Sequence, residues 1–168
     1  ERSLSRLAAM SRVFDWFFRG WVPTRAADLD VYVTYSGGDD LFLVGAWDRM
    51  VRLALAIEED FHAFACRNPA LTLSGGLALV KRRFPIGRAA ERSAHLLNRL
   101  AKGPRGPLPD DCDKASLAIF NRKVPWPVLR RIHNLAERTL IPALDEGKRV
   151  RRSALHQWLR LHRQYFGR

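Results

Sequence analysis

The feature that most constrains this chain is a short polar stretch, Gly-Gly-Asp-Asp at residues 37–40, set between two strongly apolar runs. Residues 31–34 (VYVT) precede it closely and residues 41–44 (LFLV) follow it directly. Both runs are rich in β-branched, aromatic and aliphatic side chains, which favour strands. Adjacent glycines between two strands are typical of a tight β-hairpin, because glycine adopts positive φ without a Cβ clash. The stretch therefore predicts a hairpin with Asp39 and Asp40 at or just past its tip.

Two adjacent carboxylates repel each other, and this pair would carry an electrostatic cost that a bound divalent cation could offset. Mg²⁺ and Mn²⁺ prefer oxygen ligands, which carboxylates supply. The alternative is an ordinary polar turn, since Gly and Asp are common turn residues. The flanking strands, with helix-like segments before and after them, favour a metal site, because this is the arrangement of the palm domain in nucleotide polymerases and cyclases.

The periodicity of apolar residues predicts the remaining elements. Helices are expected over residues 4–20, 48–64, 85–102 and 126–142, with another from Ser153 onward. Gly20 and Gly103 are plausible helix stops. Strands are expected over residues 71–80 and 115–120, and loops over residues 22–30 and 103–113. Gly75 and Gly76 inside a predicted strand indicate a bulge or the close approach of another backbone or a ligand.

Charge narrows the class of partner. The 168 residues carry 29 basic and 17 acidic side chains, a formal charge of +12, which favours a polyanion such as RNA, DNA or nucleotides over a merely basic protein. Cys66 and Cys112 form no metal-binding or disulfide pattern, so we expect free thiols in a reducing compartment, the cytoplasm. Because no apolar run approaches the ~20 residues that span a bilayer, we expect no membrane partner.

Several charged groups allow two interpretations. Lys81, Arg82 and Arg83 either form a solvated strand end or attract a triphosphate or RNA backbone. Lys102, in the last turn of its helix, either complements the helix dipole or contacts a phosphate. The pair Asp110-Asp111 is interpreted as turn acids, because no strand holds it in place.

Four stretches together resemble one known family. They are the run VYVTYSGGDDLFLVGAWD at residues 31–48, the helix at residues 5–20, Asn68-Pro69 with residues 71–78, and Phe84-Pro85-Ile86 with Ala89-Ala90. As a set they resemble the second palm domain of the large subunit of Csm-type, type III CRISPR effector complexes. The resemblance covers residues 4–122. It implies a palm domain, similar to GGDEF nucleotidyl cyclases, over residues 1–124, and the start of a C-terminal helical domain over residues 125–168.

This resemblance implies an α+β, ferredoxin-like palm, in which strand, helix, strand, strand, helix and strand follow one another. The predicted elements match that order with the first strand missing, followed by a helical segment. We expect the missing strand, which in the family brings a metal-binding carboxylate, to come from sequence upstream of Glu1. A fragment without it should expose an apolar slot and fold poorly.

The resemblance also implies a metal-dependent nucleotidyltransferase that joins ATP into cyclic oligoadenylates through 3′–5′ bonds. Asp39 and Asp40 would be the catalytic residues and the ligands of two Mg²⁺ or Mn²⁺ ions. Implied partners are guide RNA and target RNA in the ribonucleoprotein, other effector subunits, and the upstream part of the same polypeptide. The family's nuclease activity lies in a histidine-aspartate domain, a motif this sequence lacks.

Five further residues are implied at the nucleotide. Gly37 and Gly38 would let the substrate approach the backbone, and Ser36 would contact a base or ribose. Lys102 would face phosphates because related palms carry a basic residue at this Ala-Lys position, and Lys81 would do the same.

Two alternatives remain. A diguanylate cyclase is disfavoured because its motif usually has Glu and Phe where this chain has Asp40 and Leu41. A palm retained as a non-catalytic scaffold, binding RNA or nucleotide, is disfavoured because both acids are intact.

Overall fold

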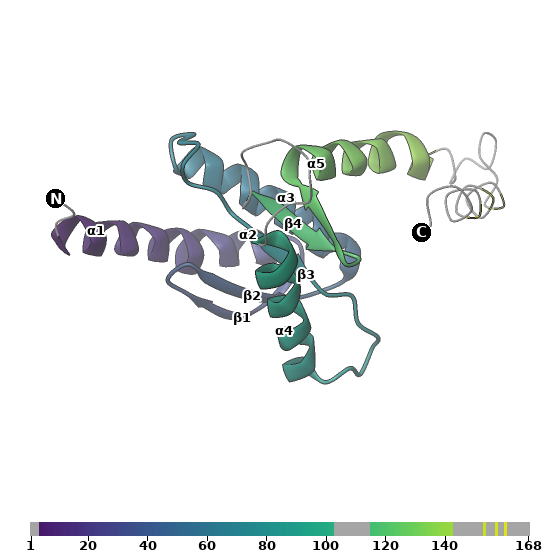
Figure 1. Cartoon of the computed structure of the whole chain (residues 1–168), viewed down its shortest axis with the longest axis horizontal. Coiled ribbons are helices and arrows are strands. Elements are labelled where there is room, and N and C mark those ends of the chain that lie inside the picture. Colours follow the sequence, from purple (N-terminus) through teal and green to yellow (C-terminus); the bar gives the residue numbers. More distant parts are fainter. Residues whose placement is uncertain (1–3, 103–114, 143–152, 154–156, 158–159, 161–168) are drawn as a thin grey trace. The chain divides into compact units, whose positions relative to one another are not determined.

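The computed structural model describes residues 4–102 and 115–142, together with Ser153, Gln157 and Arg160 (Figure 1). The chain divides into two compact units, Glu1–Trp126 and Pro127–Arg168. The first unit mixes helices with two small sheets, which agrees with the expected α+β class. Its elements are α1 (Leu4–Asp15), η1 (Trp16–Trp21), α2 (Val22–Asp28), β1 (Tyr32–Gly37), β2 (Asp40–Val44), α3 (Trp47–Phe64), β3 (Gly75–Leu77), α4 (Ile86–His95), η2 (Leu96–Ala101), β4 (Ser116–Ile119) and β5 (Arg122–Pro125).

The first helical run is longer than the sequence predicts. Helix α1, the π-helical turn η1 and helix α2 follow one another without a break, so the loop expected over residues 22–30 and the stop expected at Gly20 are wrong. Pro23 lies at the start of α2, directly after the π-helical turn η1, so it stands inside the continuous run and not at a free helix N-terminus. The run continues because Phe17, Phe18 and Val22 are buried along one side of it.

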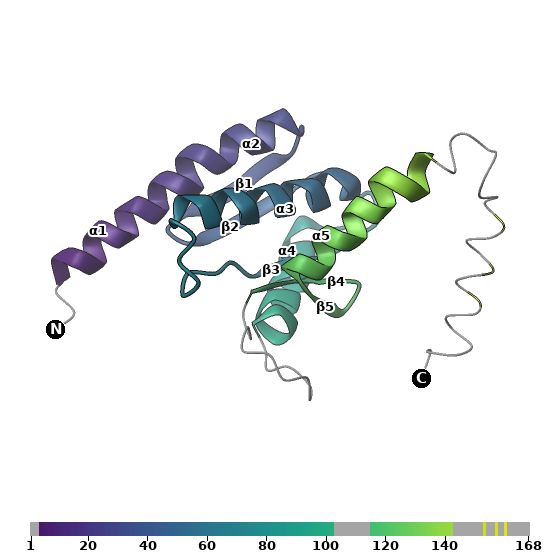
Figure 2. The ribbon, with the colours of Figure 1, turned by 90° about the horizontal axis from the view of Figure 1, so that it is seen from above.

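One core lies between this helical run, α3 and the β1–β2 hairpin. The buried side chains of the run pack against Leu53, Ile57 and Phe61 of α3, and Leu41 and Leu43 of the hairpin pack against the same cluster. The helical run and α3 lie side by side over one face of the hairpin (Figures 1 and 2). This burial removes apolar side chains from water, which is the main favourable contribution to folding.

The second sheet has the order β3-β4-β5, with β3 parallel to β4 and β5 antiparallel to it. The strand predicted over residues 71–80 is shorter than expected, and Trp126 Nε1 donates a hydrogen bond to Leu73 O, 2.9 Å away, just before β3 begins. Strand β5 was not predicted, because Arg122, Lys123 and Pro125 are typical of a sheet edge and resemble a loop in sequence. Among the described residues, no strand pairing joins this sheet to the hairpin, which fits a palm whose first strand is missing.

Gly76 confirms the expected close approach of another backbone. A Cβ atom at this position would lie 2.4 Å from Ser93 O and 2.6 Å from Leu97 N. The Ser93 hydroxyl also donates a hydrogen bond of 2.6 Å to Gly76 O. Helix α4 and the turn η2 therefore pack directly on the backbone of β3, at a distance that only glycine permits.

The second unit continues α5 (Trp126–Leu135) into the π-helical turn η3 (Ala136–Leu140), which confirms the helix expected from Trp126. Ser153, Gln157 and Arg160 are helical, while the rest of the helix predicted from Ser153 lies outside the described residues. The predicted loop 103–113, with Asp110-Asp111 and Cys112, lies outside them too, and Cys66 is exposed and free. In the described part of the chain, the helices are too short or too polar to cross a bilayer.

Candidate functional site

The register of the β1–β2 hairpin decides which side chains share a face. Val33 pairs with Leu43, and Ser36 pairs with Leu41. These two pairs lie three residues apart on β1 but only two apart on β2, because the register shifts between Val33 and Tyr35. This bulge keeps both pairs on the face that packs against the helices.

The other face of the hairpin carries Asp40. Asp40 pairs with Gly37, and Phe42 pairs with Tyr35, so these residues alternate with the partly buried Leu41 and point away from the helices. Asp40 is exposed, and Tyr35 keeps 56 % of its surface in contact with solvent. The hairpin therefore presents a carboxylate beside aromatic side chains on an open surface.

The turn itself consists of Gly38 and Asp39. Gly38 has φ +63°, while Asp39 is not among the residues with positive φ. Positive φ at the first of two turn residues suits a type II′ hairpin, which prefers glycine there. Asp39 is exposed at the tip, next in the chain to Asp40. The structure thus confirms the predicted position of two adjacent acids at the hairpin turn.

Helix α1 holds this turn through Asp15. The Asp15 Oδ1 atom accepts a hydrogen bond from Gly38 N, 3.3 Å away, and lies 2.8 Å from Arg19 Nε. Arg19 also reaches the hairpin, since its NH2 atom lies 3.3 Å from where a Cβ on Gly37 would be. Neither residue belongs to the acidic motif or to any of the predicted site residues. Their i, i+4 spacing indicates an ion pair but says nothing about the hairpin.

The five expected nucleotide-binding residues fall in three places. Ser36, Gly37 and Gly38 lie on the hairpin, with the Ser36 hydroxyl donating a 2.7 Å hydrogen bond to Phe18 O. Lys81 lies between β3 and α4, and Lys102 follows η2; both are exposed. Within the described residues, neither lysine forms a hydrogen bond or ion pair with Asp39 or Asp40.

The acid pair has the chemistry that magnesium requires. Magnesium is commonly held by one or two carboxylates together with water and substrate phosphates, so two exposed neighbouring carboxylates fit it. The described residues gather no third acidic, histidine or cysteine side chain into the same group. Any further protein ligand for the metal ion would have to come from residues outside the described part of this chain.

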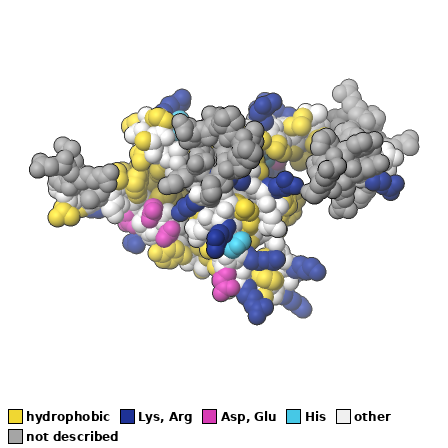
Figure 3. All heavy atoms as spheres, viewed as in Figure 1, with side chains coloured by type: hydrophobic (Ala, Val, Ile, Leu, Met, Phe, Trp, Pro, Cys, Tyr) yellow, Lys and Arg dark blue, Asp and Glu magenta, His cyan; other side chains and the backbone are white. Residues whose placement is uncertain are grey.

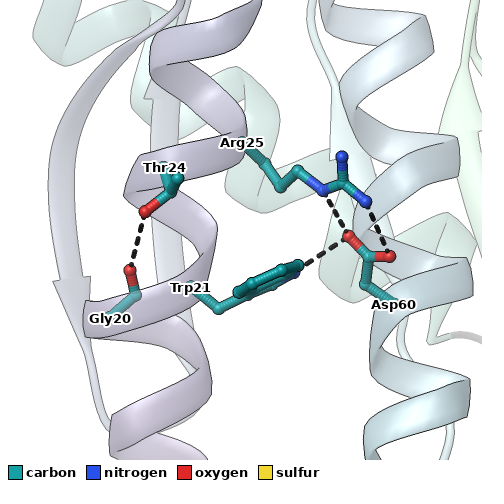
Figure 4. Close-up of polar contacts among 5 residues, drawn as sticks. All are labelled: Gly20, Trp21, Thr24, Arg25 and Asp60. Atoms are coloured by element: carbon teal, nitrogen blue, oxygen red, sulfur yellow. Dashed lines mark hydrogen bonds and ion pairs between the residues drawn. The ribbon is translucent and has the colours of Figure 1, made fainter.

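A second polar cluster joins α2 to α3 (Figure 4). Asp60 accepts hydrogen bonds from Trp21 Nε1 at 2.9 Å, Arg25 Nε at 2.8 Å and Arg25 NH2 at 3.2 Å. Burial alone would raise the pKa of Asp60, but these hydrogen bonds and the charge of Arg25 outweigh it and lower the pKa below its ordinary 3.8. Because Asp60 accepts three hydrogen bonds from Trp21 and Arg25 on the neighbouring helical run, this cluster has a structural role.

Comparison with known proteins shows that the chain matches a family model. Residues 1–107 match the family described as Cas10/Cmr2, second palm domain. A Cas10/Csm1 protein of Methanocaldococcus jannaschii is 30% identical over 145 residues, covering 75% of this chain and 18% of the relative. One from Enterococcus italicus is 32% identical over 165 residues, covering 96% of this chain and 20% of the relative. Both are named CRISPR system single-strand-specific deoxyribonucleases of subtype III-A.

Among solved structures, a chain of a Csm1-Csm4 cassette in complex with cA4 is similar. It has a TM-score of 0.53 and 25% sequence identity, and the match covers 76% of this chain and 20% of that chain. The chain thus spans about a fifth of the length of the curated relatives it matches.

Proposed function

Because this chain belongs to the Cas10/Cmr2 second-palm-domain family, we propose that it is the catalytic palm of a type III CRISPR effector subunit. The observation that carries the proposal is the pair of adjacent, exposed carboxylates, Asp39 and Asp40, at a hairpin turn tied to a helix. Acids in this position suit metal-dependent nucleotidyl transfer, which needs the phosphates neutralised and held in line.

The proposed reaction joins ATP molecules into cyclic oligoadenylates. A 3′ hydroxyl oxygen attacks the α-phosphorus of the next ATP, the bond to the β-phosphate breaks, pyrophosphate leaves and the proton passes to solvent. The similar Csm1-Csm4 cassette, which was solved in complex with cA4, supports a nucleotide of this class. The exposed face that carries Asp40 leaves open space in which such a substrate can bind.

Asp39 and Asp40 would hold Mg²⁺ or Mn²⁺. When bound, these ions supply positive charge for the triphosphate and for the departing pyrophosphate. The chain's own residues position that site, because Asp15 holds the turn and the register of β2 directs Asp40 away from the core. No atom lies within 4 Å of where a Cβ on Gly38 would be, whereas the side chains of Tyr35 and Arg19 approach that position at Gly37.

The remaining assignments are proposals of the same kind. Lys81 and Lys102 are exposed and would face phosphates. Ser36 pairs with Leu41 on the face that packs against the helices, so its proposed contact with a base or ribose would require this part of β1 to turn outward. The partners would be guide RNA, target RNA, other effector subunits and the upstream part of the polypeptide, in the cytoplasm. The deoxyribonuclease named for the relatives would belong to parts of those proteins beyond the matched fifth.

The deciding experiment uses the full-length protein assembled with its effector subunits, guide RNA and target RNA. ATP and Mg²⁺ are added, and products are separated by chromatography. Asp39→Ala with Asp40→Ala should reduce oligoadenylate formation by about 100-fold or more, as expected when groups that stabilise transition-state charge are removed. Asp48→Ala, an exposed acid in the first turn of α3, is the matched control and should retain activity.

Two outcomes would contradict the proposal. Equal oligoadenylate from the wild type and the double variant would favour the non-catalytic scaffold. A product formed from GTP, with none from ATP, would favour the diguanylate cyclase.

A further inference from the structure

A pocket separate from the hairpin lies in the first unit. It opens to solvent, has a volume of about 420 Å³ and so falls in the size range of small-molecule and nucleotide sites. Neither Asp39 nor Asp40 borders it. Its walls come from the end of β3, from α4 with η2, and from the β4–β5 turn. The lining residues are 77–79, Arg92, His95, Leu96, Phe120 and Asn121.

Phe120, at the rim of this pocket, has a backbone conformation that is unusual for its residue type. Phe120 and Asn121 form the two-residue turn between β4 and β5, with φ of +54° and +58°. Such a turn prefers Asn or Gly at both positions, because a Cβ atom disfavours positive φ. Asn121 obeys this preference, whereas Phe120 does not and leaves 71 % of its surface exposed. A bulky exposed ring at a strained position points to a role outside folding.

Arg92 lines the same pocket, and three more cations lie close in sequence to its lining residues. The guanidinium of Arg92 lies over the Phe84 ring, 5.5 Å from its centre, and so is held at the rim by a cation–π contact. Lys81, Arg82 and Arg83 are exposed and lie in the segment between Leu79, which lines the pocket, and Phe84. Figure 3 shows Lys and Arg side chains gathered in the lower part of the view, where α4 lies, with few acids among them.

From these neighbours we infer that the pocket is a contact site for single-stranded nucleic acid. One unpaired base stacks on the Phe120 ring, while Arg92, His95 and the basic segment 81–83 face the phosphates on either side. Aromatic platforms beside a basic track are the usual means of binding single strands. Exposed basic residues flank the lining segments in sequence, with 81–83 after Leu79 and Arg122 after Asn121, which suits a strand better than an isolated nucleotide.

The turn geometry provides a variant that removes the ring without harming the fold. Phe120→Gly deletes the stacking surface, and glycine suits the positive φ at this position, so the variant should fold at least as well as the wild type. Arg92→Ala removes one phosphate contact. Arg12→Ala, an exposed arginine on α1 far along the chain from the pocket residues, is the matched control for the loss of one positive charge.

Binding is measured by fluorescence anisotropy with labelled RNA and DNA single strands of about 12 nucleotides, within the usual site size. Phe120→Gly should weaken binding by about 5- to 100-fold, the range for loss of one stacked base. Arg92→Ala should weaken it and reduce the slope of log K against log salt by about 0.7. Arg12→Ala should change little. Comparison of the RNA and DNA arms distinguishes the two kinds of strand.

Three results would overturn the inference. Phe120→Gly could bind as the wild type does while circular dichroism shows it folded. Duplex DNA could bind as tightly as the single strands, which would mean that net charge alone explains the binding. AMP could displace the strand at concentrations near its own saturation, which would make the pocket a mononucleotide site. Because the pocket excludes Asp39 and Asp40 and none of these variants changes Lys81, the results are separate from the oligoadenylate assay.

Discussion

At the scale of single residues, the acid that matters most for the geometry of the site is Asp15, which is outside the motif. Its carboxylate accepts the Gly38 N–H at 3.3 Å and pairs with Arg19 at 2.8 Å, so one side chain joins α1 to the hairpin turn. A two-residue turn in a two-stranded sheet has little support of its own. Asp15 therefore restricts the positions available to Asp39 and Asp40.

Asp15→Ala should loosen the turn without unfolding the core. Loss of a hydrogen bond of about 1 kcal/mol should speed amide exchange at Gly38 by about fivefold. Asp15→Asn keeps an oxygen acceptor and should show a smaller effect. Exchange measured by NMR at Gly38, with the buried amides of α3 as the internal reference, tests this. Unchanged exchange at Gly38 in Asp15→Ala would show that the contact does not hold the turn.

Two glycines should respond in opposite ways to the same added methyl group. Gly76→Ala places a Cβ within 2.6 Å of backbone atoms of Ser93 and Leu97, which cannot rotate away. We expect a loss of about 1–3 kcal/mol in unfolding free energy. Gly87→Ala, on α4 with nothing within 4 Å, should leave stability unchanged or raise it by up to about 1 kcal/mol. Urea denaturation compares the two, and equal stabilities would contradict the packing of α4 on β3.

At the scale of elements, Asp60 connects α2 to α3 and makes their packing sensitive to acid. Its pKa is lowered in the folded chain, so the folded state favours the carboxylate. The resulting stability is fully present above the unfolded pKa of about 4 and is lost as pH falls through the folded value. Near neutral pH the contribution should be constant.

Asp60→Asn removes this titration. The melting temperature of the wild type should exceed that of the variant by a constant amount between about pH 5 and 7, and the difference should shrink below about pH 4. Glu91→Gln, an exposed acid on α4, controls for general acid effects. A difference that persists unchanged at the lowest pH at which the chain stays folded would show that Asp60 does not respond to acid in this way.

At the scale of the whole molecule, the two sheets leave strand edges open. In the described part of the chain, β2 pairs only with β1, and β3 pairs only with β4. An unpaired strand edge exposes N–H and C=O groups that can form hydrogen bonds with another strand. We propose that a strand from sequence preceding Glu1 supplies them in the longer protein, consistent with a match to a fifth of its relatives.

Extending the chain upstream should therefore protect these edges. Amides of residues 41–44 or 75–77 should exchange more slowly in the longer protein, because new ladder hydrogen bonds must open first. The urea dependence of unfolding should also steepen, since more surface is buried. Hydrogen exchange with mass spectrometry compares the two proteins, and equal exchange at both edges would contradict the added strand.

The sequence alone determined the hairpin, its two acids and the close approach at Gly76. These features depend on turn chemistry and apolar runs that act over a few neighbouring residues. The glycines at the bend and the LFLV run carry that information wherever the segment lies in the fold. For the same reason the helix from Trp126 was predicted, whereas β5, with its charged and proline residues, was not.

Only the tertiary structure decided how the site is held. The bulge between Val33 and Tyr35, the contact from Asp15 to Gly38 and the cluster around Asp60 join residues that are distant in sequence or paired across strands. The helical run continues past Gly20 and Pro23 because its apolar stripe is buried against α3 and the hairpin. In a helix interior Gly20 costs about 1 kcal/mol and Pro23 about 3 kcal/mol, while each large apolar side chain that is buried contributes about 1.5–3 kcal/mol. Burial of several such side chains along the run therefore outweighs these local preferences.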